Sequence, residues 1–335
     1  MPKKINKKIN ILVTGVGGPA GINITKLLME QKKFFNIFGL DINSHSAGQF
    51  FSHQYFIGER VSDEKKYLDF TVNFIHKNKI DILIPTVAEE LVLMEKLSNK
   101  LKSKKINCQI VVSAHEVLEL CDQKDKLYKW MDKNFADYMG HWVRLDGKNK
   151  IWKADSYFIK PVKGRGSRGC RAVTATELKF LMKNNKAEMK DFIAMEILSG
   201  REWTVDCYVN NDGTFAYIVP RLRLGLSGGI SSLGKTDNNL QVIKQTREVF
   251  EKLNSGSKIY GPVFVQWKEG KDGKVKMVEI NPRASGGLTI TALAGANPVL
   301  CLKNEIFGSK NSTSLKWKEI TVTRYFEEKV VKSAK

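Results

Sequence analysis

The segment from residue 278 to 287, Val-Glu-Ile-Asn-Pro-Arg-Ala-Ser-Gly-Gly, constrains this chain more than any other. It has the pattern of the end of a β-strand and carries Glu279, Asn281 and Arg283 at alternate positions. Because side chains alternate along a strand, the carboxylate, the amide and the guanidinium point to one side. Oxygen ligands beside a guanidinium suit Mg²⁺ and the charge of a phosphoryl group in transfer.

A hairpin signal identifies the partner of this strand. Residues 263–268 and 274–280 are β-type runs, and the Asp-Gly pair at 272–273 predicts a two-residue turn between them. That turn sets Gln266 opposite Glu279. The other face is then apolar and consists of Val265, Trp267, Val278 and Ile280. We predict that the polar face binds Mg²⁺, or Mn²⁺ in its place, through Gln266, Glu279 and Asn281; the alternative is a polar hairpin side that only faces solvent.

A second signal is a short strand, residues 157–161, which contains Lys160 near its end and runs into a glycine-rich loop. Glycines let backbone N–H groups approach phosphate closely, and a lysine meets phosphate oxygens as a point charge. We therefore predict a phosphate site at Lys160 and at the loop residues Gly164, Gly166, Ser167 and Gly169.

The next segment joins a turn to an amphipathic strand. Residues 193–198 lead through Ser199-Gly200 into a strand with Glu202, Thr204 and Asp206 on one face. Such a turn can offer backbone groups to an adenine edge, and Glu202 can accept hydrogen bonds from ribose hydroxyls.

In this order the motifs resemble the ATP-grasp superfamily, and most closely the half-modules of the carbamoyl phosphate synthase large subunit, over about residues 9–308. The resemblance implies that Lys126 and Lys160 contact ATP from the two sides of a cleft, and that Arg283 contacts the transferred phosphoryl group. It also implies that Glu196, Ile197 and Leu198 form the adenine hinge and that Glu202 binds the ribose. The metal ligands that it implies are Gln266, Glu279 and Asn281. Because the chain has one such module, we do not expect it to make carbamoyl phosphate in the usual way.

We expect an α/β fold of the ATP-grasp type, α+β in its ATP-binding lobes, behind an N-terminal Rossmann-like domain. Strand signals in the first 113 residues alternate with helical stretches near 64–77 and 89–101, a rhythm typical of a parallel sheet. The predicted parts are 1–112 for the Rossmann-like domain, 113–190 for the small ATP-binding lobe and 191–335 for the large catalytic lobe with a C-terminal extension. Residues 134–156 match no motif and are interpreted as the entry to the small lobe.

The first glycine-rich loop leaves a different function open. Residues 15–21 follow an apolar strand, and Asp41 follows the next strand, which is close to a dinucleotide-binding fingerprint. Pro19 within the loop departs from that pattern, and an NAD-dependent enzyme would leave the later motifs without a role. A strand-loop-helix of this kind also opens the N-terminal domain of ATP-grasp proteins, and that resemblance implies a structural or substrate-facing role for this loop.

Two arginines and a pair of glycines mark the expected substrate end. Arg221 and Arg223 share a face if their segment is extended, so both can clamp an anion, unless they form a solvent-exposed basic edge. Gly286 and Gly287 precede a predicted helix that reaches Leu302. The backbone amides at the N-terminus of this helix can bind a carboxylate or an acyl phosphate.

Composition narrows the class of protein. A formal charge of +20 could indicate nucleic acid as a partner, yet only 11 of the 55 basic residues are arginines and the lysines are scattered. No apolar run approaches the roughly 20 residues that cross a bilayer, and no signal-peptide core follows the N-terminal lysines. We expect a cytoplasmic protein without a nucleic-acid or membrane partner, with five reduced cysteines and an open oligomeric state that includes a homodimer.

The motifs and their resemblance to the ATP-grasp superfamily predict an ATP-dependent carboxylate-amine ligase that works through an acyl phosphate. We expect small-molecule substrates, with ATP and Mg²⁺ as cofactors. Catalysis would rest on Arg283, Lys160 and Arg221, which position and neutralise charge. The alternatives are a kinase-like enzyme that forms an acyl or carbamoyl phosphate, a nucleotide-binding regulatory module, and the NAD-dependent oxidoreductase.

Overall fold

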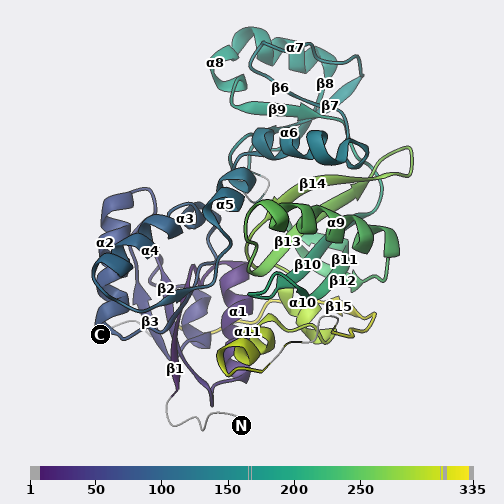
Figure 1. Cartoon of the computed structure of the whole chain (residues 1–335). Helices are drawn as coiled ribbons and strands as arrows, with labels where there is room; N and C mark the ends of the chain where they lie inside the picture. The colour runs from purple at the N-terminus through teal and green to yellow at the C-terminus, as the bar shows by residue number, and fades with distance from the viewer. Residues whose placement is uncertain (1–7, 165, 167, 310, 312–314, 332–335) are drawn as a thin grey trace.

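Three β-sheets, each built from one stretch of the chain, organise the molecule (Figure 1). The structure is a computed structural model that describes residues 8–331, except residues 165, 167, 310 and 312–314. Parallel and antiparallel sheets occur together, so the expected mixed α/β architecture is confirmed. Within the described ranges, no helix combines the length and the apolar character needed to cross a membrane.

The first sheet is parallel and has the strand order β3-β2-β1-β4-β5, as the alternating pattern predicts. Its strands are β1 Ile9–Thr14, β2 Phe35–Asp41, β3 Gln54–Ile57, β4 Ile82–Ile84 and β5 Gln109–Ile110. The connecting elements are α1 Pro19–Glu30, a 3₁₀ turn at Ala47–Phe51, α2 Glu64–Lys77, α3 Ala88–Leu91 and α4 Met94–Ser103. Helices α2 and α4 cover one face and bury a core around Leu68, Ile75 and Leu97. The single helix expected over 89–101 is therefore two helices.

The second sheet is a small antiparallel layer with the order β6-β9-β7-β8. It consists of β6 Trp142–Arg144, β7 Ser156–Pro161, β8 Arg171–Thr174 and β9 Phe192–Met195, with α7 Ala175–Asn184 and α8 Lys186–Met189 packed on it. Helix α7 begins in a capping box, in which Thr174 and Glu177 each bond the other's backbone N–H. This lobe lies at one end of the molecule in Figure 1.

The third sheet has six strands in the order β14-β13-β10-β11-β12-β15. Its strands are β10 Glu202–Val209, β11 Phe215–Ser227, β12 Ile230–Thr236, β13 Gly261–Glu269, β14 Val275–Asn281 and β15 Thr321–Thr323. The remaining elements are α5 His115–Asp122, α6 Lys124–Phe135, a 3₁₀ turn at Ala136–Tyr138, α9 Leu240–Gly256, α10 Leu288–Leu293 and α11 Pro298–Ile306. The helix expected to reach Leu302 is interrupted, because Gly295 adopts a φ of +112° and Asn297 caps a new helix.

Core packing changes two of the expected boundaries. Strand β9 belongs to the small sheet, so the division placed at residue 190 falls before a strand that the small lobe needs. Helix α6 packs Leu127, Tyr128 and Met131 into the core of the third sheet, although the sequence assigned it to the small lobe. We therefore propose that the small lobe runs from about β6 to β9, and that α5 and α6 belong to the large lobe.

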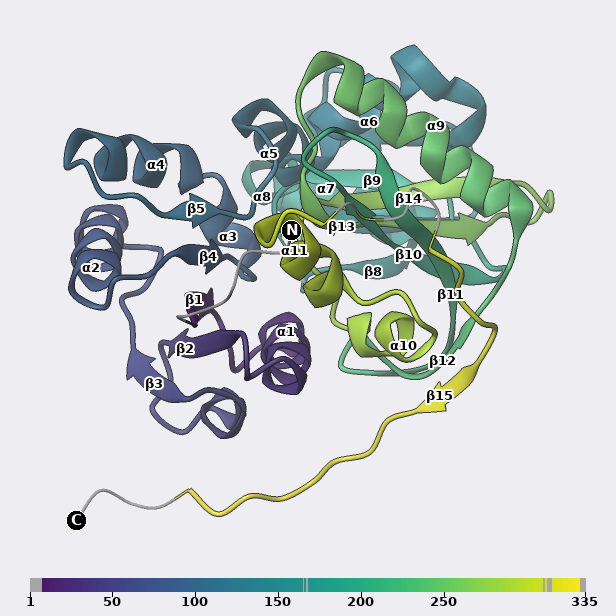
Figure 2. The same cartoon turned by 60° about the horizontal axis from the view of Figure 1, so that its bottom comes forward.

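Helix α1 joins the first sheet to the third. It lies against α10 and α11, as the turned view in Figure 2 shows. Ile24 and Leu28 of α1 share one buried core with Val219, Leu288 and Val299. The N-terminal domain and the large lobe are therefore one packed body rather than two units joined by a linker.

Candidate functional site

A cleft of about 660 Å³ lies where the three sheets meet. Parts of all three predicted lobes line it. The sequence-predicted residues on its wall are Lys160, Gly164, Gly166, Glu196, Ile197, Leu198, Glu202, Arg221, Arg223, Gln266, Glu279, Arg283, Gly286 and Gly287. Asn281 lines a smaller adjoining pocket together with Glu279 and Arg283.

The hairpin β13–β14 has the predicted pairing at the site but a different turn. Gln266 pairs with Glu279, as the sequence predicts, and Phe264 pairs with Asn281 in the same register. Trp267, however, pairs with Met277, so the register shifts by one residue at Val278. The turn has three residues, 271–273, with Gly273 at a φ of +74°. The predicted two-residue turn is wrong, because the turn has one residue more. The bulge at Val278 adds one residue to β14, so the pairing of Gln266 with Glu279 is the same as predicted.

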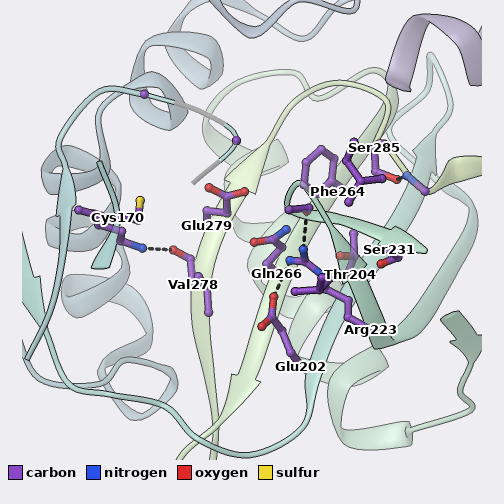
Figure 3. Close-up of a pocket in the computed structure, with 18 of the residues that line it drawn as sticks. Cys170, Glu202, Thr204, Arg223, Ser231, Phe264, Gln266, Val278, Glu279 and Ser285 are labelled. Atoms are coloured by element: carbon purple, nitrogen blue, oxygen red, sulfur yellow. Dashed lines mark hydrogen bonds and ion pairs between the residues drawn. The ribbon is translucent and has the colours of Figure 1, made fainter. Parts of the chain in front are cut away.

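This bulge changes which groups face the cleft. Val278 lines the cleft and Met277 takes the buried position, so the apolar face predicted for Val278 is wrong. The Val278 carbonyl has no partner strand residue opposite it and accepts hydrogen bonds from Tyr128 Oη at 2.6 Å and Lys160 Nζ at 3.0 Å. The bulge therefore supplies an acceptor that holds Lys160 at the cleft wall. Figure 3 shows Val278 with a hydrogen bond to its carbonyl.

Lys160 is 3% exposed and its ammonium lies 5.0 Å from the centre of the Tyr128 ring. Burial lowers the pKa of Lys160 to about 8, and the nearby Glu279 carboxylate limits the decrease. A cation in this setting is poorly solvated, so an anionic ligand can replace the missing water. This is the electrostatic setting that a phosphate site needs.

The second cation of the cleft is Lys124 rather than Lys126. Lys124 is buried, lines the cleft and donates to the Gly164 carbonyl at 3.0 Å. Burial lowers the pKa of Lys124 while Glu279 raises it. Lys126 is exposed and is not part of the cleft wall. Residues two apart on a helix point in different directions, so only one of these lysines can face the cleft.

The glycine-rich loop borders the same end of the cleft. Gly164, Gly166 and Gly169 have φ values of +146°, +60° and +73°, a region that side chains avoid, so glycine is required at each position. Gly169 is not on the cleft wall, whereas Cys170 is, and no sequence signal pointed to Cys170. Ser167 lies outside the described residues.

A chain of polar side chains crosses the floor of the cleft. Glu202 pairs with Arg223 and, at 3.3 Å, with Lys268. When its amide oxygen faces Arg223, Gln266 accepts from Arg223 Nη1 at 3.1 Å and donates to Glu279 Oε1 at 3.2 Å. Figure 3 shows Glu202, Arg223, Gln266 and Glu279 grouped on one side of the sheet, where the strand order places Glu202 between Gln266 and Arg223. Glu202 is thus already in two ion pairs on the cleft wall.

The oxygen groups fit a hard cation that keeps most of its ligands from water or nucleotide. Glu279 and Gln266 are adjacent across the hairpin, and Asn281 follows Glu279 on the same strand side. Within the described residues, no group of three or more His, Cys, Asp and Glu side chains could hold a metal ion. A site of one carboxylate and two amides is therefore suited to Mg²⁺, which needs few protein ligands, rather than to zinc.

Arg221 and the loop 285–287 form the opposite end of the cleft. Arg221 is 1% exposed, pairs with Asp206 at 2.7 Å and donates to Ser285 Oγ at 3.0 Å. A side chain at Gly287 would meet the Arg221 guanidinium at 2.6 Å, so this close approach requires glycine. The alternative, a solvent-exposed basic edge, is therefore excluded for Arg221, which is a buried and oriented cation.

The N-terminal domain closes this end of the cleft. Gly15, Gly18, Pro19 and Ala20 from the first glycine-rich loop line the wall, together with Thr86 and Val87. Asp41 accepts a hydrogen bond from the Gly17 backbone N–H at 2.7 Å, so its carboxylate is bonded within the protein. In a dinucleotide-binding site the corresponding carboxylate would bind the ribose instead. The loop lines the same cleft as Arg221, and its substrate-facing role stays a prediction.

Buried Glu90 supports this wall and was not predicted to do so. Its carboxylate accepts from Thr14 Oγ1, from Tyr67 Oη and from the backbone N–H groups of Thr86 and Val87. Burial raises the pKa of Glu90, while these hydrogen bonds oppose the increase. Glu90 therefore fixes the segment that carries Thr86 and Val87 to the end of β1.

Comparisons with known proteins show which proteins this chain is similar to in fold. A family model described as "ATP-grasp in the biosynthetic pathway with Ter operon" matches residues 188–328. The structure is similar to N5-carboxyaminoimidazole synthetase from Staphylococcus aureus complexed with ADP, with a TM-score of 0.71 and 14% identity over 96% of this chain and 83% of that chain. It is also similar to the biotin carboxylase complex from Campylobacter jejuni (TM-score 0.68, 12% identity, 91% and 72% covered). A third similar structure is L-amino acid ligase from Bacillus licheniformis (TM-score 0.66, 13% identity, 89% and 74% covered).

Proposed function

The chain has the ATP-grasp fold, and on this premise we propose that it is an ATP-dependent ligase that joins a small-molecule carboxylate to an amine. The observation that carries the proposal is a cleft with two buried lysines at one end, Glu279 and Gln266 in the middle, and oriented arginines at the other end. The similar structures include ligases and a complex with ADP, which supports this class of reaction.

ATP would lie with its phosphates at Lys160, Lys124 and the glycine-rich loop. Both lysines are desolvated, so each gains more from an anion than a surface lysine would. The adenine would lie against residues 196–198, where backbone groups can read its edge, with the ribose toward Glu202. Glu202 would exchange part of its pairing with Arg223 and Lys268 for the ribose hydroxyls.

Glu279, Gln266 and Asn281 would hold Mg²⁺ or Mn²⁺, which when bound neutralises phosphate charge during transfer. Gln266 would turn its amide oxygen from Arg223 toward Glu279 to act as a ligand. Arg283 follows the metal-binding strand and lines the cleft, so its guanidinium can meet the phosphoryl group.

The reaction has two displacements. A carboxylate oxygen of the substrate attacks the γ-phosphorus of ATP, and the bond from that phosphorus to ADP breaks. The amine nitrogen then attacks the acyl carbon, the bond from carbon to phosphate breaks, and the nitrogen loses a proton. The protein supplies orientation and charge through Lys160, Arg221 and Arg283 and forms no covalent bond. Such ATP consumption fits the cytoplasmic location that the sequence predicts.

The test is ADP release by the full chain with Mg·ATP against a panel of amino acids, other small carboxylates and amine acceptors. Stimulation that needs both a carboxylate and an amine supports the ligase and names its substrates. Stimulation by a carboxylate alone, with an acyl phosphate trapped by hydroxylamine, would instead indicate the kinase-like reaction. Absence of ATP binding in a thermal-shift experiment would overturn the proposal.

Glu279→Ala is the matched variant for this assay. It removes the one carboxylate of the metal site, so we expect metal-dependent turnover to be lost while the melting temperature stays close to that of the unaltered protein. Retained turnover in this variant would contradict the metal assignment and leave the ligase reaction itself in place.

A further inference from the structure

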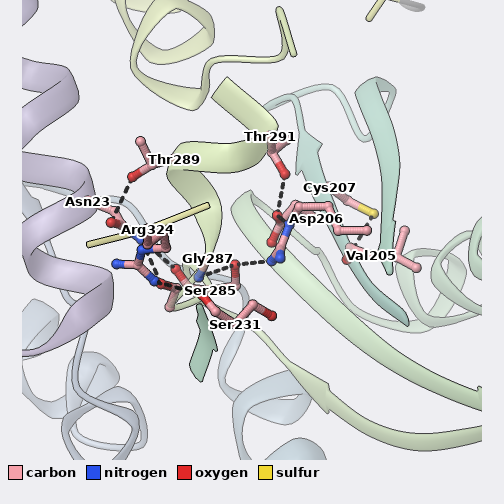
Figure 4. A network of polar contacts seen from close by, with 12 residues as sticks. Asn23, Val205, Asp206, Cys207, Ser231, Ser285, Gly287, Thr289, Thr291 and Arg324 are labelled. Carbon is pink, nitrogen blue, oxygen red and sulfur yellow. Dashed lines mark hydrogen bonds and ion pairs between the residues drawn. The ribbon is translucent and has the colours of Figure 1, made fainter. Parts of the chain in front are cut away.

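The loop 285–287 at the substrate end of the cleft is held from outside the site by two distant parts of the chain (Figure 4). Asn23 of α1 donates to the Gly286 carbonyl at 3.0 Å and to the Ser285 carbonyl at 3.4 Å. Arg324, directly after β15, donates from Nη1 to the same Gly286 carbonyl at 2.9 Å. The Gly286 carbonyl is therefore a shared acceptor for the N-terminal domain and the C-terminal segment.

Each of these donors is fixed by its own neighbours. Asn23 is 1% exposed and accepts from Thr289 Oγ1 at 2.7 Å, which orients its amide. The backbone N–H of Arg324 donates to the Ser232 carbonyl at 2.7 Å, and Nη1 also lies 3.4 Å from the Ser231 carbonyl. Arg324 thus continues the pairing of β15 with β12 and brings a guanidinium to the loop.

The same loop is bonded on its other side to the cation that faces the cleft. Ser285 Oγ accepts from Arg221 Nη2 at 3.0 Å and from the Gly287 backbone N–H at 3.4 Å. Asp206, which orients Arg221, is in turn held by Thr291 of α10. A displacement of the Gly286 carbonyl would therefore shift Ser285 and, through it, the Arg221 guanidinium.

We propose that Arg324 is a positioning residue for the reaction, and that the C-terminal segment through residue 324 is a working part of the substrate end of the cleft. Arg324 does not line the cleft itself. It acts through the Gly286 carbonyl on the loop that sets Arg221 and Gly287 against the substrate. The expected loss of turnover rests on the proposed function. The expected loosening of the loop rests on the hydrogen bonds alone.

The experiment compares full-length Arg324→Met, Arg324→Lys and Lys329→Ala. Methionine keeps the length but donates no hydrogen bond, whereas lysine can still donate one to Gly286. Lys329 is on the same segment and pairs only with exposed Glu327 among the described ion pairs, so it controls for unspecific effects at the C-terminus. Hydrogen exchange is measured by mass spectrometry over residues 283–290, and turnover with the carboxylate and amine pair found above.

We expect Arg324→Met to speed exchange in the loop and to lower kcat by about ten- to a hundredfold, the range that a small misplacement of a site residue causes. The KM for ATP should change much less than kcat, because the loop is bonded to Arg221 and not to Lys124 or Lys160. Arg324→Lys should recover part of kcat, and Lys329→Ala should match the unaltered protein. Unchanged exchange in Arg324→Met, or an equal loss at the ATP end, would overturn the inference.

A double variant tests whether the shared carbonyl is the route. Asn23→Ala and Arg324→Met each leave one donor on Gly286, whereas the pair leaves a carbonyl with neither, so the combined effect on exchange should exceed the sum of the two. Additive effects would show that the two residues act separately and would refute the shared route. Because exchange needs no substrate, a failed ligase assay and a failed positioning role can be told apart.

Discussion

At the scale of single residues, packing decides which charged side chains face the cleft and can bind a ligand. The sequence around α6 contains Lys124 and Lys126, and nothing local distinguishes them. Only the packing of Leu127, Tyr128 and Met131 into the third sheet turns Lys124 toward the cleft and leaves Lys126 in solvent. The sequence therefore locates the helix that carries both lysines, while tertiary packing decides which of them lines the cleft.

These two lysines give a matched pair of variants. Lys124→Met should weaken ATP binding by about tenfold or more, because it removes a hydrogen-bonding charge worth roughly 1.5–3 kcal/mol. Lys126→Met should leave the dissociation constant within about twofold, since exposed charges contribute little. Isothermal titration of both variants with Mg·ATP makes the comparison. The reverse order of effects would restore Lys126 as the ATP contact.

The pKa of Lys160 predicts a pH dependence of ATP binding. In the free protein the pKa of Lys160 is about 8, and bound phosphate favours the charged ammonium, so the bound state has the higher pKa. Binding therefore takes up a proton above pH 8, and ATP affinity should be flat below about pH 7.5 and fall by up to about tenfold per pH unit above pH 8.

The measurement is the dissociation constant of Mg·ATP between pH 6.5 and 9.5. Lys160→Arg serves as the control because arginine stays charged throughout this range. Most of the fall in ATP affinity above pH 8 should be lost in this variant, and Lys124, whose pKa burial also lowers, accounts for what is left. If the unaltered protein binds ATP equally well across this range, Lys160 does not titrate as the structure indicates.

At the scale of elements, the hairpin β13–β14 shows both the reach and the limit of sequence patterns. The register deduced from the Asp-Gly turn placed Gln266 opposite Glu279, and the structure confirms this pairing although the turn itself is one residue longer. The pattern could not reveal the longer turn or the bulge at Val278, because an extra residue in the turn region and an extra residue in the strand cancel in the register. Bulges depend on what the freed backbone groups can bond, here Tyr128 and Lys160, which are more than a hundred residues away.

Deletion of Val278 tests this bulge. The deletion removes the extra residue and leaves Glu279 opposite Gln266, so the sheet should still form, but the carbonyl that binds Tyr128 and Lys160 is lost. We expect a destabilisation of roughly 1–3 kcal/mol for each buried donor left without a partner, together with weaker ATP binding. Val278→Ala keeps the backbone carbonyl and should bind ATP nearly as well as the unaltered protein. The two variants are compared by thermal unfolding and by titration with ATP. Equal stability and equal ATP affinity of the two variants would contradict the role of the bulge.

At the scale of the whole molecule, the order of motifs predicted the fold, and the way the lobes share their cores was not predictable. Helix periodicity marks an apolar stripe on α1 but does not say which partner covers it. The structure shows that the partner lies more than two hundred residues later, in α10 and α11. The predicted boundary after residue 112 therefore separates two regions that share a core.

This shared core predicts cooperative unfolding. Leu288→Ala, in α10, should lower the stability by about 2–5 kcal/mol and reduce hydrogen-exchange protection in β1 as well as in the third sheet. Leu97→Ala removes a comparable side chain from the core on the opposite face of the first sheet and serves as its partner variant. Protection in β1 that survives Leu288→Ala but not Leu97→Ala would show that the N-terminal domain is stable by itself.

The long separation between α1 and its covering helices also bears on synthesis at the ribosome. When the first 112 residues have emerged, α1 can form, but α10 and α11 have yet to be made. At about 5–20 residues per second, the apolar side of α1 waits roughly 10–40 s for its partner. During this time the nascent chain carries an uncovered hydrophobic face, so its earliest part should be a client for chaperones until its last third is complete.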